Sequence, residues 1–140
     1  MGWIASIARG RFRGLVRRAL ALTPRGFIRN DVLRLTRLST RLRLEWRSRD
    51  IHPWDRTLPT GRQRALLEKQ LLHDADAAIE RLFAMLPDAE AIEVRVLEPE
   101  PPDRVALSGT VTREDAAATR SLPSVRMRLQ MMGLRLRFLD

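Results

Sequence analysis

The chain has 140 residues, which is one domain's worth, and 44% of them are hydrophobic, enough for a modest core. It contains no cysteine, which excludes disulfides, thiolate metal sites and cysteine nucleophiles. The net charge of +9 is unevenly placed, since residues 1–64 hold 16 arginines and 4 acids whereas residues 65–140 hold 9 arginines and Lys69 against 13 acids. A basic half of this kind is typical of an arm or a face that meets an anionic partner.

Residues 1–22 predict a basic amphipathic helix, because the apolar residues fall on about half of a helical wheel and most arginines lie opposite. The arginines expected to attract phosphates are Arg9, Arg13, Arg17 and Arg18, and the residues expected to add apolar contact are Trp3, Ile4, Ile7 and Phe12. Pro24 ends this helix, so residues 1–30 form an extension with its connector and residues 31–140 form a single domain. Arginines interrupt the apolar run too often for a secretory signal or a membrane span, and we therefore expect a cytoplasmic or membrane-peripheral protein.

Between residues 31 and 47 the spacing of the apolar residues changes from helical to alternating. Residues 31–39 predict two helical turns capped by Asn30 or Asp31, whereas residues 41–47 alternate between apolar and charged side chains, as a half-buried strand does. Residues 50–59 are irregular, because Pro53 and Pro59 prevent regular structure.

The strongest helical pattern covers residues 61–86, where apolar residues recur at helical spacing up to Pro87. Thr60 and Gln63 have the spacing of a capping box, in which each side chain satisfies a free backbone amide of the first turn.

The last third predicts two strands, residues 92–96 and 105–111, joined by a stiff proline-rich turn. Thr112 is expected to cap a short helix that Pro123 interrupts, and a helical face then continues to Gly133. A final alternating strand covers residues 134–138.

The order strand, helix, strand, strand, helix, strand is that of a split βαβ unit, and it predicts an α+β, ferredoxin-like domain whose antiparallel sheet has both helices on one face. In that arrangement the first and last strands are neighbours, so their arginines share the open face. These are Arg41, Arg43, Arg47, Arg135 and Arg137. Because the outward positions carry no aromatic residues, this face is expected to bind phosphates without reading bases.

Residues 92–133 resemble BON modules in their succession of strand, strand and helix. The resemblance rests on IEVRV, then RVALSGTV, then the helical segment that ends at Gly133. The glycine that those modules have just before Val105 is absent, and Pro123 breaks the following helix, so no residue role is carried over.

Few residues suggest chemistry. Asp50, His52 and Asp55 match no ligand spacing with a known mechanism, and we expect Asp50 and Asp55 to cap turns while Trp54 plugs the edge of the core. The methionines at 127, 131 and 132 are assigned to core packing. No phosphate loop, nucleophile motif or metal-ligand motif is present, and so we expect neither a catalytic site nor a cofactor or metal.

The sequence therefore predicts a small non-enzymatic binding or scaffolding module. The basic arm and the sheet arginines would hold an anionic membrane surface or a nucleic acid such as RNA, and such binding weakens steeply with salt. The alternative is a subunit of a homo-oligomer or larger assembly, in which the N-terminal helix packs on a partner chain.

Overall fold

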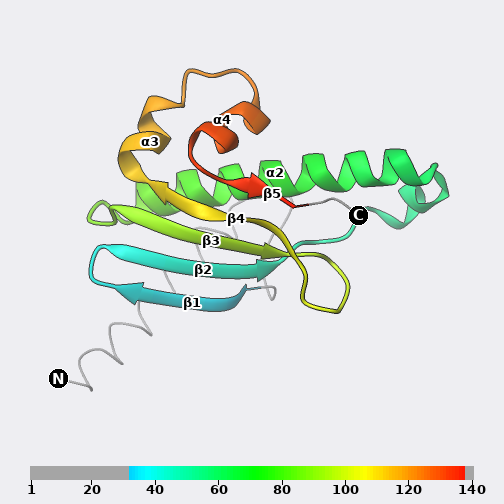
Figure 1. The fold of residues 1–140 in the computed structure, drawn as a ribbon, viewed down its shortest axis with the longest axis horizontal. Coiled ribbons are helices and arrows are strands. Elements are labelled where there is room, and N and C mark those ends of the chain that lie inside the picture. Colours follow the sequence, from blue (N-terminus) through cyan, green and yellow to red (C-terminus); the bar gives the residue numbers. More distant parts are fainter. Residues whose placement is uncertain (1–31, 138–140) are drawn as a thin grey trace.

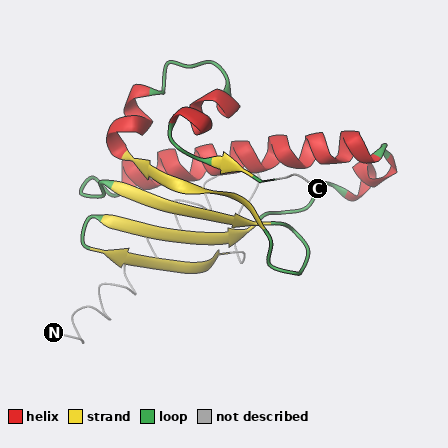
Figure 2. Ribbon diagram, in the orientation of Figure 1, coloured by secondary structure: helices red, strands yellow, loops and turns green. Residues whose placement is uncertain are grey.

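The structure of the chain is a computed structural model, and it describes residues 32–137. The predicted N-terminal helix and its connector lie outside these residues, together with their predicted anion-binding and apolar side chains. The described elements are β1 (Val32–Leu38), β2 (Arg41–Arg47), the 3-10 helix η1 (Pro53–Thr57), α2 (Thr60–Met85), β3 (Ala91–Leu97), β4 (Val105–Thr112), α3 (Arg113–Ala118), α4 (Val125–Met131) and β5 (Arg135–Leu136). The predicted mixed α+β class is confirmed (Figure 2).

The five strands form one sheet in the order β1-β2-β3-β4-β5 (Figure 1). Strands β2 and β3 are parallel and are joined by α2, whereas every other neighbouring pair is antiparallel. The ferredoxin-like order is therefore not confirmed, because β2 pairs directly with the next strand of the predicted series and β5 pairs with β4 at the far edge.

The different position of the last strand follows from the segment before β2. The prediction of helical turns there is wrong, because residues 32–38 form β1 and pair with β2 through a tight turn at Ser39 and Thr40. Ser39 adopts the left-handed backbone conformation that such a turn requires, with φ 58°. Strand β1 thus occupies the edge of β2 that a ferredoxin-like domain gives to its last strand.

One face of the sheet is covered by helices. The inward residues of β2, β3 and β4, among them Leu44, Val94 and Leu107, pack with residues of α2 and α4 into a single core cluster. Helix α2 is 26 residues long, but no residue before Leu71 is buried, so its N-terminal part projects beyond the sheet (Figure 1). The helix is as predicted, although its capping box is not formed: Pro59 is the N-cap, and Gln63 instead donates hydrogen bonds to carbonyl oxygens of the preceding loop.

The chain returns to the sheet through two short capped helices. Thr112 caps α3 as predicted, and Ser124 caps α4 just after Pro123. The end of α4 is a Schellman motif, in which Gly133 has φ 99° and the Leu134 amide donates to the Leu129 carbonyl oxygen over 2.9 Å. This turn leads into β5, which confirms the predicted last strand for residues 135–136 only.

Candidate anion-binding face and a proline-walled cleft

The sheet face opposite the helices carries a ladder of charged side chains. In the register of the strands, Arg43 lies beside Glu93 and Glu45 lies beside Arg95. Both pairs are ion pairs, with a nitrogen–oxygen distance of 3.2 Å for the first and 3.3 Å for the second. Both arginines and Glu93 are about half exposed, whereas Glu45 is 16% exposed. Exposed ion pairs contribute little to stability, about 0–1 kcal/mol each, so Arg43 in particular can exchange its carboxylate partner for another anion.

All the predicted sheet arginines except Arg47 are exposed, but they are less close together than predicted. Arg41 and Arg43 lie on β2 and Arg135 on β5, and two strands separate them, which corresponds to about 14 Å at the usual strand spacing. Within residues 32–137, Arg41, Arg135 and Arg137 form no hydrogen bond or ion pair through their side chains. Arg47 is different, because it binds Asp103 and the Glu98 carbonyl oxygen.

Two further arginines of this face were not predicted from the sequence. Arg34 is exposed on β1 next to Glu45, and its segment was predicted to be helical. Arg95 is exposed on β3, and its alternation with the buried residues Val94 and Val96 was the signal that could have found it. The exposed part of this face ends before the end of β3, where the outward position Leu97 is buried.

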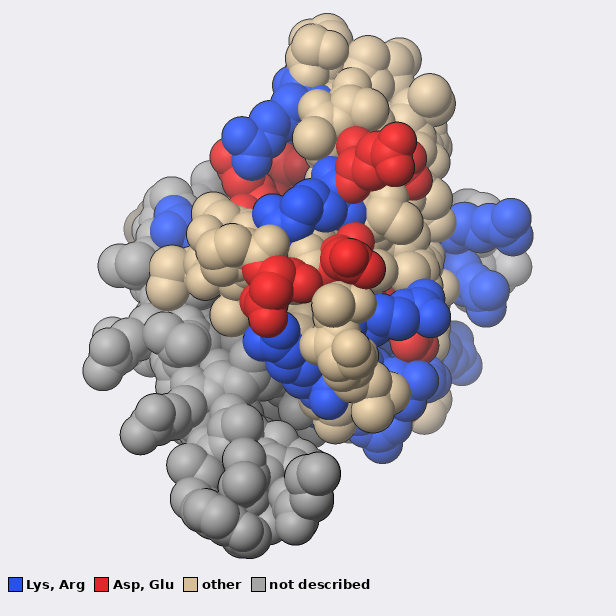
Figure 3. Space-filling view, turned by 90° about the vertical axis from the view of Figure 1, so that its left-hand side faces the viewer, with Lys and Arg blue, Asp and Glu red and all other residues tan. Residues whose placement is uncertain are grey.

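The end of the molecule at which β1 turns into β2 has a different charge distribution. Figure 3 shows acidic and basic side chains interspersed there. Arg37 is ion-paired with Asp88, and Thr40 donates a hydrogen bond to Glu90 over 3.1 Å. Because its charges compensate each other, this end is a poorer site for an anion than the sheet face opposite the helices, which we call the outer sheet face.

The loop between β2 and α2 contains Asp50, His52 and Asp55, and the first two of them hold the turn together. Asp50 accepts a hydrogen bond from the Ile51 amide over 2.8 Å and pairs with Arg56 over 2.9 Å. The 3-10 helix is capped by His52, whose Nδ1 accepts from the Trp54 amide over 3.2 Å, and not by Asp55 as predicted. In the described part of the chain, no three histidine or acidic side chains are grouped so that they could hold a metal ion.

Trp54 was expected at the core edge, and that prediction is wrong. Its side chain is 82% exposed and contacts His52 edge-on, with 5.7 Å between the ring centroids. The core edge is instead closed by Ile51, which is 7% exposed. The sequence offered no alternation in this segment, and so it gave no sign of which side chain turns inward. The methionine prediction is likewise only partly confirmed, because Met132 is buried whereas Met127 and Met131 are exposed.

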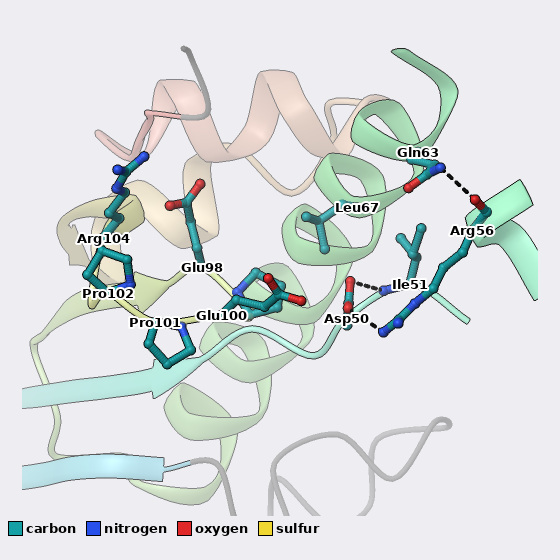
Figure 4. A pocket seen from close by; sticks show the side chains of 11 residues that line it. Asp50, Ile51, Arg56, Gln63, Leu67, Glu98, Glu100, Pro101, Pro102 and Arg104 are labelled. Atoms are coloured by element: carbon teal, nitrogen blue, oxygen red, sulfur yellow. Dashed lines mark hydrogen bonds and ion pairs between the residues drawn. The ribbon is translucent and has the colours of Figure 1, made fainter. Parts of the chain in front are cut away.

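A cleft of about 590 Å³ opens between this loop and the loop that follows β3 (Figure 4). Its position, beyond the carboxyl ends of the parallel strands β2 and β3, is where open sheets with parallel strands commonly bind ligands. One wall carries Asp50, Ile51, Arg56, Gln63 and Leu67, and the other carries Glu98, Pro99, Glu100, Pro101, Pro102 and Arg104. The second wall was predicted to be a stiff turn only, although its alternation of proline and glutamate is visible in the sequence.

The comparisons with known proteins add no identity. No protein-family model, curated protein or solved structure matches the chain, so the resemblance to BON modules is not supported by a family match. None of the helices that the structure describes is both long enough and apolar enough to cross a membrane.

Proposed function

We propose that the protein is a small non-catalytic binding module whose outer sheet face holds the phosphates of a nucleic acid. The observation that carries this proposal is the set of exposed arginines on the sheet face away from the helices. Arg41 and Arg135 make no ion pair with any other described residue, and the exposed Arg43 and Arg95 each have a single ion-pair partner, the exposed Glu93 and the partly buried Glu45. Guanidinium groups bind phosphate oxygens in a bidentate manner, and a flat strand face presents several of them at once.

The composition of the face favours a nucleic acid over a membrane surface. Its neutral outward residues are mainly small and polar, such as Ser108 and Thr110, and none of its described residues is aromatic. Among the residues whose side-chain exposure the structure describes, Leu38 at the hairpin turn is the one large exposed apolar residue of this face. A membrane-bound face needs apolar side chains that enter the headgroup region, whereas phosphate contacts need only charge and small donors.

In this proposal the arginines of the N-terminal arm, Arg9, Arg13, Arg17 and Arg18, extend the phosphate-binding surface. The apolar residues of the arm support the competing hypothesis, an anionic membrane surface. The two hypotheses predict different responses to different ligands, and so one experiment compares them.

The test measures binding of the full-length chain to fluorescent single-stranded RNA and to vesicles that contain phosphatidylserine, each over a series of salt concentrations. The variant Arg41→Gln with Arg135→Gln is compared with Lys69→Gln plus Arg120→Gln, which removes the same charge from exposed positions on α2 and in the turn after α3. The plot of log K against log salt has a negative slope, to which each single-strand phosphate contact contributes about 0.7. We expect the sheet variant to reduce the magnitude of this slope by about 1.4, because two contacts are lost. Equal losses in both variants would show that net charge alone drives binding, and binding to vesicles only would assign the face to a membrane.

A further inference from the structure

Trp54 extends into solvent from a turn that several hydrogen bonds hold together. Its amide donates to His52, its carbonyl oxygen accepts from the Thr57 hydroxyl over 3.1 Å, and Arg56 is tied back to Asp50. Gln63 adds hydrogen bonds to the carbonyl oxygens of Arg56 and Leu58, over 2.9 Å and 2.7 Å. A tryptophan that stays 82% exposed on such a turn is already placed for a partner, because little side-chain or loop entropy is lost when it binds.

The cleft beside this turn has the chemistry that an indole ring and nearby arginines require. Pro99, Pro101 and Pro102 provide a stiff apolar wall, and Ile51 and Leu67 lie on the opposite side (Figure 4). At about 590 Å³ the cleft is within the usual size range of ligand pockets and is wide enough for one indole. The side chains of Glu98 and Glu100 form no hydrogen bond or ion pair within the described residues.

The charges of the two features are complementary. The exposed residues at the start of α2 include Arg62 and Arg64, and neither forms an ion pair in the described part of the chain. The 3-10 helix that contains Trp54 ends at Thr57, three residues before α2 begins. The free carboxylates of the cleft are the groups that such arginines bind. Tryptophan and arginine are also the residues most enriched among the energetic centres of protein interfaces.

The projecting tryptophan and the cleft belong to adjoining parts of one surface. Trp54 lies between Ile51 and Arg56 on the same loop, and both of these residues line the cleft. A projection and a recess that adjoin on one molecule suit a two-fold axis, because such an axis lets each copy insert into the other at the same time.

We propose that the protein forms a two-fold symmetric dimer in which Trp54 of each copy enters the proline-walled cleft of the other. The arginines at the start of α2 then face Glu98 and Glu100 of the partner. Each buried tryptophan contributes about 150–250 Å². Stable interfaces bury about 1,600 Å², so this small reciprocal contact is expected to give a weak, reversible dimer. The proposal is independent of anion binding by the sheet.

The first experiment is sedimentation velocity of the full-length chain from about 1 to 300 μM, a range that brackets the affinity expected for a small interface. We expect a concentration-dependent monomer–dimer equilibrium that Trp54→Ala weakens about 30-fold or more, the loss typical of a central interface residue. The matched control is Met131→Ala, which removes another large exposed apolar side chain, 66% exposed, from α4 and should leave the equilibrium unchanged. A monomer at every concentration, or a dimer that Trp54→Ala leaves intact, overturns the proposal.

A complementation experiment separates a missing interface from a failure to fold. The variant Glu98→Arg with Glu100→Arg keeps the tryptophan and removes the acceptor, whereas Trp54→Ala keeps the acceptor and removes the tryptophan. Each variant alone should be monomeric, and an equimolar mixture should form a one-to-one complex that retains one of the two insertions. A mixture that associates no more strongly than either variant alone, with both variants folded by circular dichroism, overturns the reciprocal geometry, as does binding of Trp54 to vesicles in place of a second copy.

Discussion

The guanidinium group of Arg113 lies over the ring of Phe83, 4.8 Å from the ring centroid, and donates a hydrogen bond to the carbonyl oxygen of the same residue. The same guanidinium donates to the carbonyl oxygens of Leu86 and Ala89. These carbonyls lie at the end of α2 and in the turn after it, where a helix leaves carbonyl groups without partners. Arg113 therefore fastens the long helix to the start of α3, and it adds one cation to the helix C-terminus.

Removal of this guanidinium should destabilise the fold. Arg113→Met should lower the free energy of unfolding by about 2–3 kcal/mol, because three carbonyl oxygens are deprived of a charged donor while much of the side-chain volume is kept. Chemical denaturation measures the change, with Arg120→Met as the control, since Arg120 is exposed and reaches Glu80 only at 3.6 Å. Equal stability of the two variants would mean that water replaces the Arg113 hydrogen bonds at little cost.

A second prediction concerns the closest approach between β4 and the turn before β5. A β-carbon added at Gly109 would lie 2.5 Å from the Gly133 carbonyl oxygen and 2.9 Å from Leu134 Cδ2. Gly109→Ala should therefore destabilise the fold by about 1–3 kcal/mol, the usual cost of overpacking. The matched control is Gly61→Ala in the projecting part of α2, where nothing lies within 4 Å. That change should stabilise by up to about 1 kcal/mol, because alanine is the better helix former. Thermal denaturation of both variants checks the opposite signs.

The fold could be predicted from the sequence only where burial is periodic. The alternation in residues 41–47, 92–96 and 105–111 predicted three strands correctly, and the apolar spacing predicted α2, because one-sided burial leaves a periodic record. The strand order could not be predicted from periodicity. The pairing of β1 with β2 depends on a turn at Ser39, and this turn lacks the glycine or asparagine that usually indicates a hairpin in a sequence. The period of residues 32–38 was assigned to a helix, and that one error changed the neighbours of the last strand.

The candidate site shows the same division. The sheet arginines were placed on the correct face, since alternation assigns a side chain to a face whatever the strand order. Their spacing was wrong because spacing depends on that order. The prediction for Trp54 was wrong and the cleft was not predicted, because irregular loops have no period and their shape follows from hydrogen bonds such as those of Gln63 and Gln70.

A third prediction distinguishes the contribution of the arm arginines to anion binding from that of the sheet arginines. In the full-length chain, changing Arg9, Arg13, Arg17 and Arg18 to glutamine should reduce the magnitude of the slope of log K against log salt for RNA. The expected reduction is about 0.7 for each phosphate that is no longer bound. When the arm and sheet variants are combined, the decrease in slope should be close to the sum of the two, because distant sites act independently. Fluorescence anisotropy over a salt series measures the slopes. If the combined variant has the same slope as the arm variant alone, the sheet arginines bind no phosphate.

A fourth prediction links dimerisation to anion binding without making either depend on the other. A two-fold dimer presents two sheet faces, so a long RNA can reach both, whereas an oligonucleotide short enough for one face cannot. Linking two sites in this way can raise the apparent affinity by about 10²–10⁴ without any new interaction. Trp54→Ala should therefore weaken binding of the long RNA and leave binding of the short one unchanged, when both are measured at a protein concentration that supports the dimer. If the variant weakens both RNAs equally, Trp54 binds the nucleic acid itself; if it weakens neither, the second face of the dimer takes no part in binding.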